Sequence, residues 1–359
     1  MADQSKRYRV VQWATGNVGS RALRRVIEHP DYDLVGVWVN SESKVGLDAG
    51  DLAGTAPTGV KATNSIDDII ALKPDCVLYM PHVNRPDEVC RLLESGANVV
   101  TTRMEYHYPG WMAPDVRAKL EEACQHGNTS IYASGSSPGF ISEAVPFALM
   151  SIQRKLERFE IHEYADCSSR NSPEMLFQMM GFGAEPGPTA QANLDHIKSS
   201  FGGSLSMTAE ALGLPIDNFE VSGGQGVARK DVQIAAGTVP KGTVAATRTV
   251  LTGMRNGEPL MSFAAVWYVS TDVDTSDGKD WDFRDSGWRL LVKGDCPMDI
   301  GITFPCPEED YPAMTPGLTA HRPVNSIAAV CEAPAGIRTT ADLPQVIPKL
   351  EQGKIVFRP

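Results

Sequence analysis

The chain has 359 residues, 42% of them hydrophobic, and a formal net charge of −11. This length predicts two domains, each with a buried core. The acidic balance, without a long block of lysine and arginine, argues against nucleic acid as a partner. The N-terminus enters the first predicted strand without an apolar leader, and no apolar run reaches the roughly 18 residues of a membrane helix. We therefore expect a cytoplasmic protein with no membrane partner.

The cysteine and histidine patterns predict neither disulfides nor a metal site. The seven cysteines are odd in number and scattered, with no C-x-x-C pair, which favours reduced thiols. The seven histidines are dispersed and include no H-x-x-x-H, so no metal ligation is expected.

The first third of the chain alternates strand-like and helix-like segments. Short apolar runs predict buried strands at 8–14, 33–39, 75–80, 98–102 and 129–133. Helical periodicity covers 85–96 and 113–127 between them. Gly96 and Gly127 follow the last periodic residues, which predicts a left-handed cap at each position. This alternation is typical of a doubly wound parallel sheet of the Rossmann type.

The remainder of the chain follows a different pattern. Residues 135–156 are predicted to form one long helix. From 219 to about 304 apolar and polar residues alternate, which predicts an antiparallel sheet, and Asn256-Gly257 is a strong hairpin signal. Residues 321–336 return to a helical period.

We therefore predict an α/β fold with two domains. A Rossmann-type dinucleotide-binding domain spans 1–137 and is completed by 320–359. A substrate-binding and dimerisation domain of the α+β class, with an open antiparallel sheet, spans 138–319. Because an open sheet leaves a face or an edge to be covered, we expect a homodimer.

The turn after the first strand has the features of a dinucleotide cradle. Its sequence is an A-x-G-x-x-G variant of the fingerprint, with a strand before it and a helix after it. Gly16 would let the backbone approach a pyrophosphate, and Gly19 would allow close packing of the helix on the strand. The alternative is an ordinary tight turn. The predicted cradle residues are Ala14, Thr15, Gly16, Asn17, Val18 and Gly19.

The end of the second strand bears on the choice of cofactor. NAD-binding folds usually place an acidic residue there, but this chain has Asn40 and Ser41, followed by Glu42 and Lys44. Uncharged residues would not repel a 2′-phosphate, and Lys44 could pair with one. We therefore predict NADP(H), with NAD(H) as an alternative if Glu42 binds the ribose and Lys44 is surface.

Several motifs together resemble a known family of dehydrogenases. They include the turn at Gly16, VGLDAGDLAG at 45–54, Pro81-His82, NVVTTRMEYHYP at 98–109, SGSSPGF at 134–140 and PVNSIAAV at 323–330. The chain resembles the dihydrodipicolinate-reductase-type dehydrogenases and, more closely, the 2,4-diaminopentanoate dehydrogenase and native amine dehydrogenase family. It lacks the H-H-x-x-K motif of true dihydrodipicolinate reductases, so reduction of a C=N bond is expected but synthesis of tetrahydrodipicolinate is not.

Glu105 is the predicted catalytic residue. It follows the strand that ends in NVVTT, at the edge where open α/β sheets bind their ligands. The resemblance implies that this carboxylate handles ammonia. A base there could free ammonia from ammonium, move protons as water leaves a carbinolamine, and stabilise a cationic iminium. The alternative is that Glu105 only favours the N-terminus of the helix containing Asp115.

The resemblance also suggests further site residues. In the strand 158–169, His162 and Asp166 could form a proton relay or a structural pair. Asn325, at the start of a predicted late helix, would lie near the nicotinamide. The predicted substrate-pocket residues are Phe140, Tyr164, Phe177 and Met180. The predicted cofactor contacts outside the cradle are Asn40, Ser41, Lys44, Pro81, His82, Thr102, Arg103 and Asn325.

The sequence thus predicts an NAD(P)H-dependent amine dehydrogenase that acts on CH-NH2 donors and, in reverse, aminates a ketone or aldehyde with ammonia. Its partners would be a small amine or carbonyl compound and ammonia. The alternatives are a dihydrodipicolinate-reductase-like C=N or C=C reductase, and a redox sensor that binds the dinucleotide without turnover.

Overall fold

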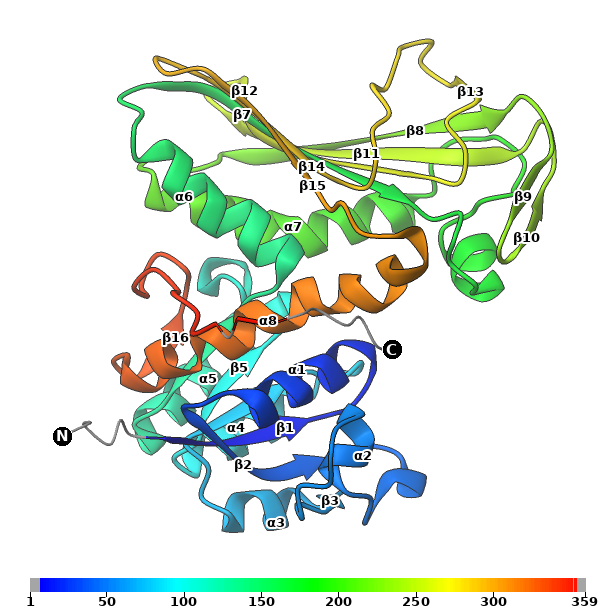
Figure 1. Cartoon of the computed structure of the whole chain (residues 1–359). Helices are drawn as coiled ribbons and strands as arrows, with labels where there is room; N and C mark the ends of the chain where they lie inside the picture. Colours follow the sequence, from blue (N-terminus) through cyan, green and yellow to red (C-terminus); the bar gives the residue numbers. More distant parts are fainter. Residues whose placement is uncertain (1–6, 351, 354–359) are drawn as a thin grey trace. The chain divides into compact units, whose positions relative to one another are not determined.

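The computed structural model describes residues 7–350 and 352–353 (Figure 1). The chain forms two compact units. The first, unit 1, comprises residues 1–144 and 313–359, and the second, unit 2, comprises 145–312. Residues 351 and 354–359 of the predicted domain completion lie outside the described residues.

Unit 1 contains a parallel sheet, as the alternating pattern predicts. Its spatial order is β16-β6-β5-β4-β1-β2-β3, and each neighbouring pair is parallel. The strands are β1 (Tyr8–Trp13), β2 (Tyr32–Trp38), β3 (Ala62–Thr63), β4 (Cys76–Tyr79), β5 (Asn98–Thr101), β6 (Ser130–Ala133) and β16 (Gly336–Arg338). The predicted doubly wound sheet is confirmed.

Helices cover both faces of this sheet. They are α1 (Asn17–Glu28), α2 (Ala49–Ala53), α3 (Ile66–Ala71), α4 (Pro86–Glu94), α5 (Pro114–Gly127) and α8 (Tyr311–Glu332). Because successive strand residues point to opposite faces, Val11 packs in one core with Leu92 of α4. Val10 packs in the other core with Ala22 of α1 and Val324 of α8. The sheet is therefore buried on both sides.

The two predicted helix caps differ in their outcome. Gly96 has φ +94° just after α4, so the left-handed cap is confirmed. Gly127 is instead the last residue of α5, and Asn128 takes the left-handed conformation with φ +51°. A side chain at 127 would place its Cβ 1.8 Å from the Leu93 carbonyl oxygen. Gly127 is thus required by the close approach of α5 to the end of α4.

The single long helix predicted over 135–156 is wrong. The backbone at residues 137–139 is not helical, and helical turns continue only to Met150 at the end of α6 (Val145–Met150). Gly139 has φ +122°, and a Cβ there would lie 2.8 Å from Ser134 Oγ. Pro138 also disfavours helical backbone in the residue before it. The Pro-Gly pair therefore interrupts the helix that the apolar periodicity suggests.

Unit 2 contains a seven-stranded sheet in the order β13-β8-β11-β12-β7-β14-β15 (Figure 1). Its strands are β7 (Leu156–Asp166), β8 (Asn218–Ala228), β11 (Val244–Arg255), β12 (Glu258–Tyr268), β13 (Val273–Thr275), β14 (Gly287–Gly294) and β15 (Met298–Thr303). The β7–β12 pair is parallel and the other pairs are antiparallel. The predicted antiparallel sheet is therefore mixed, because β7 enters it from an earlier part of the chain.

Other elements of unit 2 complete the fold. Asn256 and Gly257 have φ +52° and +79°, which confirms the predicted tight hairpin between β11 and β12. Strands β9 (Val232–Ile234) and β10 (Gly237–Val239) form a separate hairpin, and α7 (Gln191–Ala211) packs on the seven-stranded sheet. Further helical turns of the two units, within the described residues, lie at Glu42–Lys44, Met104–Tyr106, Pro109–Trp111, Ser136–Ala144, Glu174–Met179 and Glu308–Asp310.

The structure also describes the cysteines, possible metal ligands and the longer helices. All seven cysteines are free thiols. Over the described part of the chain, no group of three or more His, Cys, Asp or Glu side chains is arranged to hold a metal ion. No helix within 7–350 is both long and apolar enough to span a membrane.

The contact between α4 and α5 generates a stability prediction. Gly127→Ala forces a methyl group against the Leu93 carbonyl, so it should lower the free energy of unfolding by about 2 kcal/mol, a typical overpacking cost. The matched control is Gly301→Ala, since residue 301 has open space around its Cβ position and its φ is not positive. Chemical denaturation of both variants tests this, and equal midpoints would contradict it.

Candidate functional site

The carboxyl ends of the unit 1 strands bring the predicted cofactor residues to one edge of the sheet. The strand order reverses between β1 and β4, and open α/β sheets bind ligands beside such a reversal. The loop 14–19 follows β1, residues 81–82 follow β4, and residues 102–105 follow β5. The sheet thus assembles these three predicted segments along its carboxyl edge.

The turn after β1 has the geometry of a phosphate cradle. Ala14, at the place of the first fingerprint glycine, has φ +72°. A Cβ on Gly19 would lie 2.2 Å from the Ala14 carbonyl oxygen, whereas a Cβ on Gly16 would meet nothing within 4 Å. Gly19 therefore permits the close approach of α1, and the space beside Gly16 is open to a ligand.

The N-terminus of α1 is free of competing groups. No side chain caps α1 at Gly16, and its first turn carries no acidic residue. By contrast, Asp48 and Ser65 accept hydrogen bonds from the first turns of α2 and α3. The first-turn N–H groups around Asn17 and Val18 can therefore bind phosphate oxygens. These features fit a bound dinucleotide.

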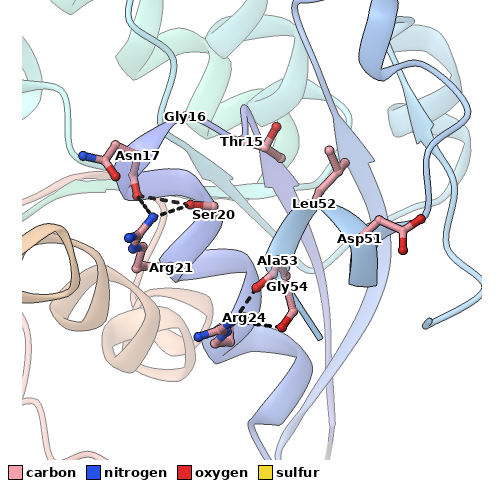
Figure 2. Close-up of a pocket in the computed structure, with 10 residues that line it drawn as sticks. All are labelled: Thr15, Gly16, Asn17, Ser20, Arg21, Arg24, Asp51, Leu52, Ala53 and Gly54. Carbon is pink, nitrogen blue, oxygen red and sulfur yellow. Dashed lines mark hydrogen bonds between the residues drawn. The ribbon is translucent and has the colours of Figure 1, made fainter. Parts of the chain in front are cut away.

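Two arginines beside the cradle were missed by the sequence analysis. Arg21 and Arg24 line a cavity of about 440 Å³ that also reaches Thr15 and Gly16. Figure 2 draws these residues. Arg21 Nη1 donates to Ser20 Oγ at 3.2 Å, and its buried Nε has no hydrogen-bond partner. Burial, followed by the neighbouring charge of Arg24, lowers the pKa of the Arg21 guanidinium.

These arginines supply uncompensated positive charge. Arg24 donates to the carbonyls of Ala53 and Gly54, and no ion pair within the described residues includes Arg21 or Arg24. The spacing R-x-x-R on the helix after the fingerprint was the available sequence signal, because residues three apart share a helix face.

The polar residues after β2 each have a different hydrogen-bond partner. Lys44 Nζ donates to the carbonyl and hydroxyl oxygens of Thr15, at 3.0 and 3.2 Å. Glu42 Oε1 instead accepts from Asn64 Nδ2 at 2.7 Å. Ser41 Oγ lies 2.8 Å from Ser43 Oγ. Lys44 thus reaches the cradle, whereas the carboxylate of Glu42 is bonded to the residue after β3.

Asn40, at the end of β2, is hydrogen-bonded to a further cation, the guanidinium of Arg85. Its Oδ1 accepts a long hydrogen bond, 3.5 Å, from the guanidinium of Arg85 in the loop after β4. Arg85 also pairs with Glu88, so its charge is partly compensated.

Glu105 is held by a two-point contact with Arg103. Nε of Arg103 donates to Glu105 Oε2 at 3.1 Å, and Nη2 donates to Oε1. Arg103 Nη1 also donates to the carbonyl of His82 at 2.7 Å. The side chain of Glu105 is 45% exposed. The planar guanidinium therefore fixes the direction of an accessible carboxylate.

The backbone around this ion pair is itself anchored. Thr101 Oγ1 donates to the Tyr79 carbonyl at 2.6 Å and accepts from the Arg103 N–H at 3.0 Å. Thr102 and Pro81 are half-buried in the adjoining loops. The ends of β4 and β5 are thus joined by side-chain bonds.

Asn325 and Phe140 lie in different environments. Asn325 lies well inside α8, so its predicted place at a helix start is wrong. Its Oδ1 is buried and has no hydrogen-bond partner among the described residues, so it can accept a hydrogen bond from a ligand. Phe140 is 37% exposed, and its N–H donates to the Gly135 carbonyl.

Of the three predicted pocket residues in unit 2, Met180 lines a cavity, whereas Tyr164 and Phe177 do not. Met180 lines a cavity of about 730 Å³, together with Glu163 and Ala165 of β7. Tyr164 is 3% exposed, belongs to the neighbouring buried core, and by strand alternation points to the opposite face of β7 from Glu163 and Ala165. Phe177 packs against that core and is not part of the cavity lining.

The possible relay between His162 and Asp166 is not formed. His162 Nε2 lies 3.1 Å from Glu160 Oε2, which lowers the pKa of the Glu160 carboxyl. Asp166 Oδ1 accepts from the Ser168 N–H. Although His162 and Asp166 share a strand face, each binds a nearer partner.

The chain is similar in sequence and in fold to known proteins. A family model described as the 2,4-diaminopentanoate dehydrogenase C-terminal domain matches residues 187–355. The chain is similar to an amine dehydrogenase of Streptomyces virginiae, with 29% identity over 347 residues that cover 93% of this chain and 95% of that protein. Its fold is similar to the solved amine dehydrogenase from Mycobacterium smegmatis, with a TM-score of 0.72, 19% identity, and coverage of 95% and 97%.

The three matches cover both units and agree with the resemblance found in the sequence motifs. Together they show that the chain is similar to 2,4-diaminopentanoate dehydrogenases and amine dehydrogenases, and that it is an NAD(P)-dependent oxidoreductase.

Proposed function

We propose that this protein is an NADP(H)-preferring amine dehydrogenase in which Glu105 is the catalytic base. The observation that carries the proposal is the position of Glu105, an accessible carboxylate directed by Arg103 at the carboxyl edge of a dinucleotide-binding sheet. The Streptomyces virginiae relative, an amine dehydrogenase, supports the choice of amines as substrates. The homodimer and the cytoplasmic location stay predictions.

The cradle residues 14–19, Lys44 and Asn325 would hold the cofactor. When bound, the cofactor exchanges a hydride with the carbon of the C–N bond. Ionised Glu105 would accept a proton from ammonium, which frees ammonia to attack the carbonyl carbon. It would then donate that proton to the departing hydroxyl of the carbinolamine, and it would stabilise the cationic iminium by charge. In the deamination direction the same proton steps run in reverse.

Arg103 makes this role compatible with a partly exposed site. An exposed ion pair contributes little to the stability of the fold. The two-point contact of Arg103 therefore serves mainly to orient the Glu105 carboxylate. Because each carboxylate oxygen has a second lone pair, Glu105 can bind Arg103 and an incoming N–H group together.

Positive charge at the end of β2 supports NADP(H) over NAD(H). Lys44 is bonded to the cradle, and Arg21 and Arg24 add uncompensated charge beside it. A 2′-phosphate is the dinucleotide group that would use such charge. The acidic residue nearest this strand end, Glu42, is bonded to Asn64 instead.

The cradle is tested with Gly19→Val. The added side chain clashes with the Ala14 carbonyl and should weaken NADPH binding at least tenfold, about 1.4 kcal/mol. Ala14→Gly is the matched control, since glycine adopts the positive φ of residue 14 freely, and it should keep the parent affinity. Fluorescence titration with NADPH measures both. An unchanged affinity in folded Gly19→Val protein would refute the cradle.

Cofactor choice is tested with Lys44→Ala. Loss of the ammonium should weaken binding of NADPH about tenfold and leave that of NADH within about twofold, because only NADPH carries the 2′-phosphate. Lys61→Ala, which removes an exposed lysine paired with Asp48, should change neither affinity. Equal losses for the two cofactors after Lys44→Ala would argue against this role.

The chemistry is tested with Glu105→Gln. This change keeps the size of the side chain but removes the base, so reductive amination should slow by about 100-fold or more while NADPH binding persists. Glu88→Gln is the control, since Glu88 is also a glutamate paired with an arginine but lies in α4. Amine and alcohol products from NADPH, ammonium and small carbonyl compounds are quantified.

Three outcomes of that assay count against the assignment. Alcohol without amine would indicate a carbonyl reductase, and no product would favour a non-catalytic sensor. Amination at the parent rate by Glu105→Gln would show that another group is the base.

A further inference from the structure

The cavity of unit 2 lies on one face of the seven-stranded sheet and has a volume of about 730 Å³. Much of its lining is apolar, and includes Met175, Met179, Met180, Ile197 and Trp267. This volume is typical of a pocket for a small molecule. Of these five residues, only Met180 is a pocket residue predicted from the sequence.

Glu163 places a carboxylate in this lining. It lies in β7, an inner strand of the sheet, where it pairs with Ala265 of β12. Ala265 in turn pairs with Thr249 of β11, and all three residues line the cavity. Strand alternation therefore sets Glu163 on the floor of the cavity, among small neighbours that leave its carboxylate accessible.

Two indole groups hold the Glu163 carboxylate in place. Trp288 Nε1 donates to Oε2 at 2.9 Å, and Trp267 Nε1 donates to Oε1 at a longer 3.4 Å. Both donors are neutral, so they fix the direction of the carboxylate without compensating its charge. The ion pairs found within the described residues do not include Glu163.

The other charged or titratable side chains of the lining are Arg170, Glu185 and His196. Within the described part of the chain, the side-chain hydrogen bonds of Glu163 come from the two indoles, and no ion pair joins it to Arg170 or His196. A half-buried carboxylate without a counter-ion costs free energy. A ligand that brings a positive charge removes this cost.

The chemistry of the lining selects the kind of cation. Trp267 directs its indole N–H at Glu163, and the methionine side chains of the lining can adapt to an alkyl chain. A carboxylate beside flexible apolar walls is a combination that suits an alkylammonium ion. Among the described residues, no group of three or more His, Cys, Asp or Glu side chains is arranged to hold a metal ion instead.

We propose that the Glu163 cavity binds a primary alkylammonium group, with Glu163 as its counter-ion. The inference rests on the proposed function in one respect, since an enzyme of amines would meet this group on its substrates.

Binding is tested without turnover by calorimetry on the full chain, with hexylammonium and hexanol as probes. The parent should bind hexylammonium about tenfold more tightly than hexanol, the scale of a charge-assisted contact. Glu163→Gln should remove this difference and leave hexanol within about threefold of the parent, because the amide oxygen still accepts an indole hydrogen bond.

Two variants separate charge from structure. Glu185→Gln removes the other carboxylate of the lining and should keep the preference for hexylammonium. Trp288→Phe removes one indole donor but keeps the Glu163 charge, so it should also keep that preference. Equal binding of the two probes by the parent, an unchanged preference in Glu163→Gln, or loss of preference in Glu185→Gln would each overturn the proposal.

A turnover assay separates this site from the proposed function. Failure to oxidise any amine would refute the proposed function, and calorimetry would still decide the binding site.

Discussion

The close approach of α1 to the end of β1 is the constraint on which the candidate site depends. Residue 19 has no side chain, and a Cβ there would lie 2.2 Å from the Ala14 carbonyl oxygen. Because this contact is possible, the uncapped first turn of α1 begins directly beyond the strand, with its N–H groups free for an anion. Lys44 and Arg21 then contribute charge around the same turn.

The parallel register of the unit 1 sheet extends this edge to the proposed chemistry. Parallel strands end on the same side, so the segment after β5 lies along the same sheet edge as the loop after β1. Bonds from Thr101 join β5 to β4, and Arg103 binds both His82 and Glu105. The orientation of the proposed base is therefore a product of strand pairing and of one planar guanidinium.

In unit 2, alternation along β7 separates two kinds of side chain. Tyr164 is buried and points to one face of β7, while Glu163 and Ala165 point to the other face and line a cavity. Glu163 therefore lines the cavity, whereas Tyr164, the pocket residue suggested by the family resemblance, does not. The two indoles that bind Glu163 come from β12 and β14, the strands on either side of β7.

The sequence by itself determined the parallel sheet, the tight turn between β1 and α1, and the hairpin at Asn256-Gly257, because each depends on local periodicity or on backbone conformations that few residues adopt. Tertiary structure decided what depends on partners distant in the chain. Gly127 is needed for a helix contact rather than a cap, and β7 makes the second sheet mixed. The surroundings of Glu163 likewise come from strands more than 100 residues away, and no spacing along the chain records that proximity.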